Sequence, residues 1–190
     1  MDKAPLHLSF DELLNQKTPK ILWADDDSVN LRFGIDFIRS LGFEGISARD
    51  GQEAYEQVLK EFPDLVLLDV NMPRMNGYEV CEKIKQDETL RSIPVIMITA
   101  LTDTRANIRG IEAGADDYIT KPFDLLLLEA RIRNSLKNKY YHDRLFYYQQ
   151  KLTFYNEQLE HEVKNRTQQI EETQEATIFA LAKLAESRDP

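Results

Sequence analysis

The feature that most constrains the fold is an alternation of short apolar runs with helical patterns between Lys20 and about Ala130. Five short runs have the composition and length of buried strands: ILWA, FEGISA, DLVLLDV, PVIMITA and DYIT. Helical spacing follows each run, which predicts helices over 28–41, 52–62, 77–86 and 103–113 and another from about Asp124. Such alternation predicts a five-stranded, parallel, doubly wound α/β sheet covered on both faces.

The residues at the predicted boundaries agree with this pattern. Asp27 or Ser28 can cap the first helix, and Gly42 can end it. Pro63 stands before the third strand, and Gly114 follows the fourth helix.

The C-terminal third has the composition of one long helix. Glycine is absent from Asp124 to Pro190, and proline occurs only at the last position, so roughly sixty residues would span ~90 Å of helix. A small globular core cannot bury such a length. Apolar residues recur in steps of three and four, which predicts a parallel homodimeric coiled coil whose seam is Leu145, Tyr148, Leu152, Tyr155 and Leu159.

The predicted seam changes its spacing after Leu159. A second step of four leads to Val163, and the seam then passes Arg166 or Thr167, Ile170, Gln174 and Thr177. Two steps of four in succession make a stutter, which locally unwinds a supercoil. The segment is a candidate two-state element, although ordinary coiled coils also stutter.

Composition excludes several classes of partner and location. The formal net charge of −9 argues against binding to a nucleic-acid backbone. The first residues do not form a secretory signal, and no run approaches the ~20 apolar residues of a membrane span. We therefore expect a cytoplasmic protein with no membrane or nucleic-acid partner, in which the single cysteine, Cys81, is a small buried hydrophobe.

Polar residues stand where four of the predicted strands end. Asp25 and Asp26 follow the first strand, Asp69 ends the third, Thr99 ends the fourth and Lys121 follows the fifth. The carboxyl ends of parallel strands meet at one edge of the sheet, where ligand sites form. Three clustered carboxylates would repel one another without a cation, and a hard divalent ion with oxygen ligands, Mg²⁺, fits them best.

This arrangement suits phosphoryl transfer to a carboxylate. With Mg²⁺ bound, Asp69 would be the nucleophile, Lys121 would neutralise one phosphoryl oxygen, and Thr99 could donate a hydrogen bond to another.

The stretches ILWADDD, LVLLDVNMPRMNG, IPVIMITA and AGADDYITKPF resemble the receiver domain of two-component response regulators, from about Lys20 to Leu136. The resemblance implies a flavodoxin-like fold with a phosphoacceptor aspartate. It makes Asp69 the phosphoacceptor and implies that Asp26, Asp69 and the backbone carbonyl of Asn71 bind the metal, with Asp25 near it through water. It further implies that Lys121 pairs with the acceptor or the phosphoryl group. Thr99 and Tyr118 would be the switch pair.

The same resemblance implies a partner and a mode of action. A sensor histidine kinase would donate the phosphoryl group, after which the face of the fourth helix, fifth strand and fifth helix would repack. A receiver catalyses only its own phosphorylation and dephosphorylation, so this chain is not expected to be an enzyme in the usual sense. A cis Lys121–Pro122 bond is also implied.

The final stretch, TQEATIFALAKLAESRDP, resembles the opening of the HD-GYP domain of cyclic di-GMP phosphodiesterases. No His-Asp pair follows Arg188 and Asp189, so only a truncated start of that domain is expected, without hydrolytic activity. We therefore divide the chain into an arm (1–18), a receiver (19–136), a coiled-coil linker (137–175) and the start of an output domain (176–190).

Three alternatives remain at the level of sequence. The C-terminal stretch is rich in alanine and leucine, so it could instead be only the end of an ordinary coiled coil. The acidic pocket could be vestigial, leaving a structural dimerisation module. A haloacid-dehalogenase-like phosphatase would also use an aspartyl nucleophile, but it places a second acid two residues later, where this chain has Asn71.

Overall fold

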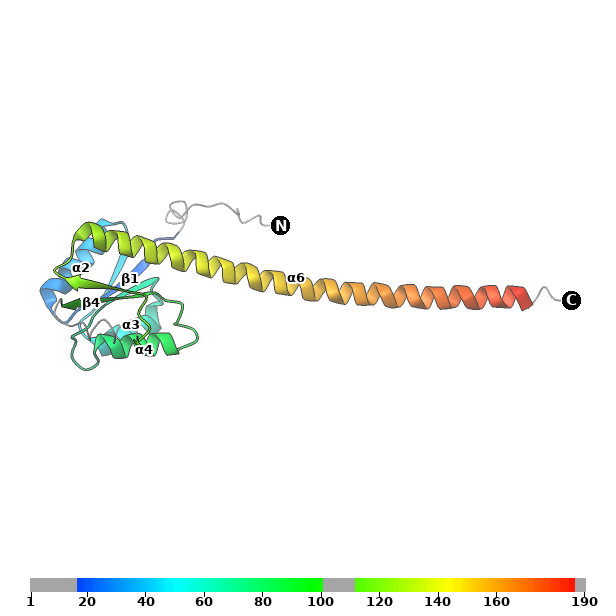
Figure 1. Ribbon diagram of the computed structural model, residues 1–190, viewed down its shortest axis with the longest axis horizontal. Helices are drawn as coiled ribbons and strands as arrows, with labels where there is room; N and C mark the ends of the chain where they lie inside the picture. Colours follow the sequence, from blue (N-terminus) through cyan, green and yellow to red (C-terminus); the bar gives the residue numbers. More distant parts are fainter. Residues whose placement is uncertain (1–16, 101–111, 187–190) are drawn as a thin grey trace. The chain divides into compact units, whose positions relative to one another are not determined.

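The computed structural model describes residues 17–100 and 112–186, with side chains described up to residue 183. Five parallel strands form one sheet in the order β2-β1-β3-β4-β5. Helices lie on both sides of this sheet (Figure 1). The strands are β1 (Lys20–Ala24), β2 (Glu44–Ala48), β3 (Leu65–Asp69), β4 (Val95–Ala100) and β5 (Asp117–Lys121). This is the predicted doubly wound, flavodoxin-like fold.

Four helices lie in the described residues: α2 (Ser28–Ser40), α3 (Gly51–Glu61), α4 (Gly77–Gln86) and α6 (Leu125–Glu186). The helix predicted over 103–113 falls almost entirely outside the described residues, as does most of the arm 1–18. The Lys121–Pro122 peptide bond is cis, as expected.

Helix ends follow local side-chain chemistry. The Asp27 carboxylate accepts hydrogen bonds from the backbone N–H groups of Val29 (2.8 Å) and Asn30 (3.0 Å), so Asp27 rather than Ser28 caps α2. Gly42 has a positive φ of 86° just after α2, a conformation that glycine adopts without a steric penalty. Asn76 and Glu79 form a reciprocal capping box at the start of α4.

The sheet separates two apolar layers because alternate strand residues point to opposite faces. On one face, Leu22, Val66, Leu68, Val95 and Met97 pack with residues of α3 and α4, including Cys81. On the other, Ile21, Trp23, Leu65, Leu67, Ile96, Ile98 and Ile119 pack with α2 and with Leu128, Ile132 and Leu136 of α6. Trp23 and Cys81 are therefore core residues, as predicted.

The chain divides into two compact units, Met1–His142 and Asp143–Pro190. The described part of the second unit is helical, and from Gln149 to Lys183 every side chain is exposed. Its exposed apolar residues include the predicted seam positions Leu145, Leu152 and Leu159. None of the described helices, α6 included, combines the length and apolarity needed to cross a membrane.

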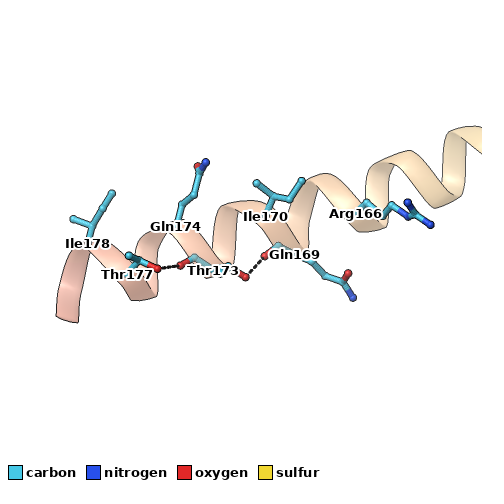
Figure 2. Close-up of a pocket in the computed structure, with 7 residues that line it drawn as sticks. All are labelled: Arg166, Gln169, Ile170, Thr173, Gln174, Thr177 and Ile178. Carbon is cyan, nitrogen blue, oxygen red and sulfur yellow. Dashed lines mark hydrogen bonds between the residues drawn. The ribbon is translucent and has the colours of Figure 1, made fainter. Parts of the chain in front are cut away.

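A shallow groove runs along α6 in the segment after the predicted stutter. It is lined by Arg166, Gln169, Ile170, Thr173, Gln174, Thr177 and Ile178. Ile170, Gln174 and Ile178 point to the same side of the helix (Figure 2). The hydroxyls of Thr173 and Thr177 donate to backbone carbonyls four residues earlier in the helix (Figure 2).

Candidate functional site

The polar residues predicted to meet are placed by the carboxyl ends of four strands. Asp25 directly follows β1, Asp69 ends β3, Thr99 lies in β4 and Lys121 ends β5. The strand order reverses its direction of winding between β1 and β3, so Asp25 and Asp69 flank the crevice in which doubly wound sheets bind ligands.

Lys121 joins the two buried carboxylates. Its ammonium group donates to Asp25 Oδ2 at 2.8 Å and to Asp69 Oδ1 at 2.7 Å. Asp25 is only 1% exposed, and its other oxygen accepts from the Asp27 backbone N–H (3.0 Å) and the Asn30 side-chain amide (3.3 Å). Asp69 Oδ2 accepts from the Asn71 backbone N–H at 3.1 Å.

Burial and hydrogen bonding oppose each other at both Asp69 and Lys121. Desolvation raises the pKa of Asp69, with a smaller contribution from the charge of Asp25, while the hydrogen bonds from Lys121 and the Asn71 N–H oppose the rise. Burial would lower the pKa of Lys121, but its hydrogen bonds to Asp25 and Asp69 outweigh this effect, and that pKa is raised. Lys121 therefore remains charged between two carboxylates.

The cluster has the donors of a divalent-cation site. Asp25, Asp26 and Asp69 each offer one carboxylate oxygen, and these oxygens lie within 4.8 Å of one another. Asp26 is exposed whereas the other two are buried, so the site opens to solvent on one side. Oxygen-only donors, excess negative charge and access to water fit Mg²⁺, which keeps several of its waters when bound.

The predicted switch residues do not join this cluster by hydrogen bonds in the described part of the chain. Thr99 is buried, and its hydroxyl donates to the Ala100 carbonyl at 3.3 Å. Tyr118 lies beside Met97 in the register of β4 and β5, and its side chain is 46% exposed.

Sequence reasoning missed three residues around the cluster. Asn30 was not assigned a role, yet its amide reaches Asp25. Asp50 and Arg74 form an ion pair between the start of α3 and the loop after Asp69. Asp50 and Arg74 lie far apart in the chain, so the sequence alone could not link them, although the Asp50-Gly51 dipeptide is a local signal for a helix start. Asn30 lies only five residues after Asp25, but nothing in the sequence distinguished it from other polar residues of the helix.

Comparisons with known proteins define the class. Residues 21–133 match the family described as "Response regulator receiver domain". The chain therefore belongs to the receiver-domain family of response regulators.

Individual relatives agree with this assignment. A Vibrio cholerae protein named "Probable cyclic di-GMP phosphodiesterase" is 39% identical over 185 residues, 97% of this chain and 39% of that protein. "Response regulator PleD" of Caulobacter vibrioides is 41% identical over 126 residues, 66% of this chain and 28% of that protein. The chain thus spans well under half the length of both relatives.

Solved structures show the same fold. The signal receiver domain of a signal transduction histidine kinase from Syntrophus aciditrophicus superposes with a TM-score of 0.61 at 35% identity, covering 64% of this chain and 92% of that one. The chemotaxis protein CheY4 of Vibrio cholerae superposes with a TM-score of 0.59 at 27% identity, covering 63% and 99%.

Proposed function

We propose that Asp69 accepts a phosphoryl group from a phosphohistidine of a sensor histidine kinase in a Mg²⁺-dependent reaction. The observation that most directly supports this proposal is the position of Lys121, whose ammonium group donates to the Asp69 carboxylate at 2.7 Å within the acidic cluster. In the step, an Asp69 oxygen bonds to phosphorus as the phosphorus–nitrogen bond of the donor breaks, and the imidazole leaves.

The residues around Asp69 have distinct proposed roles. Asp26, Asp69 and the backbone carbonyl of Asn71 would hold Mg²⁺, with Asp25 close by through water. Bound there, Mg²⁺ supplies positive charge that offsets the phosphoryl oxygens. Lys121 now donates hydrogen bonds to both Asp25 and Asp69. On phosphorylation it would keep the bond to Asp25 and transfer the other from Asp69 to a phosphoryl oxygen.

Thr99 and Tyr118 form the proposed switch pair. Among the described residues the Thr99 hydroxyl donates to the neighbouring Ala100 carbonyl at 3.3 Å, and a phosphoryl oxygen would offer it a stronger, charged acceptor. Movement of Thr99 would leave space beside β4 into which the exposed Tyr118 side chain could turn. That change would repack the face of β5 and the helices beside it.

We further propose that residues 137–175 are a homodimeric coiled-coil linker. The support is the row of exposed apolar residues at a seam spacing on α6, for which a second copy supplies cover. The receiver would occupy 19–136, and residues 176–190 would begin an output domain.

The output domain is proposed to be a cyclic di-GMP phosphodiesterase of the HD-GYP type. Similarity to the Vibrio cholerae protein covers 97% of this chain and so extends past the receiver into the C-terminal segment. A cytoplasmic location without nucleic-acid contact fits the net charge of −9.

Intact-mass analysis after incubation with Mg²⁺ and acetyl phosphate tests the phosphoacceptor. We expect a single phosphoryl adduct on the wild-type chain and on Asp36→Ala, which removes an exposed carboxylate of α2. Asp69→Ala should give none. Failure to label the wild type, under conditions that label another receiver, would favour the vestigial structural dimeriser.

A further inference from the structure

A second ionic contact joins the start of α3 to the loop 70–76, which begins directly after Asp69 of the acidic cluster. The guanidinium of Arg74 pairs with Asp50 Oδ2. Asp50 is 2% exposed, and its other oxygen caps α3 by accepting from the Glu53 backbone N–H at 3.0 Å. The Asp50 carboxylate thus caps α3 and also forms an ion pair with the loop.

Packing at the same place brings the backbones close together. A Cβ atom on Gly51 would collide with the carbonyl group of Met75, so only glycine permits this approach of α3 to the loop. Arg74 itself has a positive φ of 66°, an uncommon conformation that carries an energetic cost for a residue with a side chain. Contacts made by the loop must offset that cost.

Other contacts fix the two ends of the loop. At its start, the Asn71 N–H donates to Asp69 Oδ2 at 3.1 Å. At its end, the Gly77 N–H donates to the Val70 carbonyl at 3.0 Å, and Met72 is buried in the core. The Asp50–Arg74 pair is therefore the ionic contact that holds the middle of the loop.

We propose that Asp50 and Arg74 are positioning residues for the metal site. Their ion pair and the close approach of Gly51 to Met75 would hold the loop in the conformation that the Asn71 carbonyl needs to reach a cation at the acidic cluster. This inference rests on the proposed function, in which the Asn71 carbonyl binds Mg²⁺. It adds that the strength of Mg²⁺ binding depends on a contact made by side chains outside the cluster.

The geometry makes the pair suitable for mutation. The Arg74 side chain is 65% exposed, so its removal opens no cavity, and Asp50 still caps α3 in the variant. Asp50→Asn keeps an oxygen for the Glu53 N–H and removes only the charge that Arg74 meets. Arg32→Ala is the matched control, because Arg32 is an exposed cation paired with an exposed carboxylate on α2.

Titration of the full chain with MgCl₂ by calorimetry is the direct test. Partners that orient a metal ligand typically contribute 10–100-fold to affinity, so we expect Arg74→Ala and Asp50→Asn each to weaken Mg²⁺ binding by about 10-fold. The double variant should bind no more weakly than either single one, because both remove the same contact. Arg74→Lys should recover part of the loss, and Arg32→Ala should bind like the wild type.

A second readout separates positioning from a general loss of structure. At saturating Mg²⁺, acetyl phosphate should label Arg74→Ala at nearly the wild-type rate, since Arg74 touches none of the reacting groups. A wild-type chain that binds Mg²⁺, with Arg74→Ala and Asp50→Asn binding it equally well, would overturn the inference while leaving the proposed function intact. Absence of Mg²⁺ binding by the wild type would overturn both.

Discussion

At the scale of single residues, Asp69 combines burial, a neighbouring carboxylate and one ammonium partner. The Lys121 ammonium group forms ion pairs with both Asp69 and Asp25, so without a metal ion these two buried carboxylates share one cation. Two buried carboxylates that share one cation reduce the stability of the fold, and the proposed Mg²⁺ would offset that loss.

Replacing Asp69 by asparagine should therefore stabilise the metal-free chain. Its folded-state pKa lies above the ordinary value of 3.8, so the folded state disfavours the ionised carboxylate. The penalty is fully present above the folded-state pKa and disappears as the pH falls to about 3.8. Thermal unfolding at pH 7 without Mg²⁺ should show Asp69→Asn melting higher by several degrees, corresponding to about 1 kcal/mol.

Two controls bound this prediction. The difference in melting temperature between Asp69→Asn and the wild type should be smaller at pH 4.5 than at pH 7, because part of the wild-type Asp69 is then protonated. Added Mg²⁺ should narrow or reverse it at pH 7, because the ion stabilises only a chain that binds it. A lower melting temperature for Asp69→Asn at pH 7 would mean that the Lys121 contact outweighs desolvation.

At the scale of elements, the sequence predicts what local chemistry determines. Asp27 and Asn76 lie next to the helices that they cap, so the starts of α2 and α4 could be predicted from neighbouring residues. The strand-end cluster was predictable because parallel strands bring their carboxyl ends to one edge. The Asp50–Arg74 pair was not, because nothing in a single sequence links a residue of one loop to a residue of another.

Gly34 in α2 is a further example of a long-range requirement. A Cβ atom there would collide with the indole ring of Trp23, so the helix lies directly on this buried side chain. Gly34→Ala should destabilise the receiver by about 1–2 kcal/mol, because overpacking outweighs the gain in helix propensity. Urea unfolding followed by circular dichroism measures the change.

Val29→Ala provides the comparison on the same helix. Val29 is largely exposed, so its truncation should change the free energy of unfolding by less than about 0.5 kcal/mol. Equal stability of Gly34→Ala and the wild type would show that α2 can shift away from Trp23 at little cost.

At the scale of the whole molecule, α6 presents a row of apolar residues that are exposed among the residues the structure describes. Leu145, Leu152 and Leu159 are exposed, and Tyr148 and Tyr155 recur between them at the spacing of a two-stranded seam. After Val163 the predicted seam carries polar residues, including Gln174 and Thr177. Cover by a second copy should therefore matter more before the stutter than after it.

Single substitutions to aspartate along α6 test whether the segment before the stutter contributes more to dimerisation than the segment after it. Leu152→Asp places two buried charges in the proposed seam and should weaken dimerisation at least about 100-fold, equivalent to about 2.7 kcal/mol. Gln150→Asp adds the same charge outside the seam and should leave the dimer unchanged. Ile170→Asp should weaken dimerisation less than Leu152→Asp, because the polar residues Arg166 and Gln174 line the same groove and leave less apolar surface there for a second copy to bury. Sedimentation equilibrium gives the three dissociation constants. Equal losses for Leu152→Asp and Ile170→Asp would show one uniform seam, whereas a monomeric wild type would require another partner for the exposed face of α6.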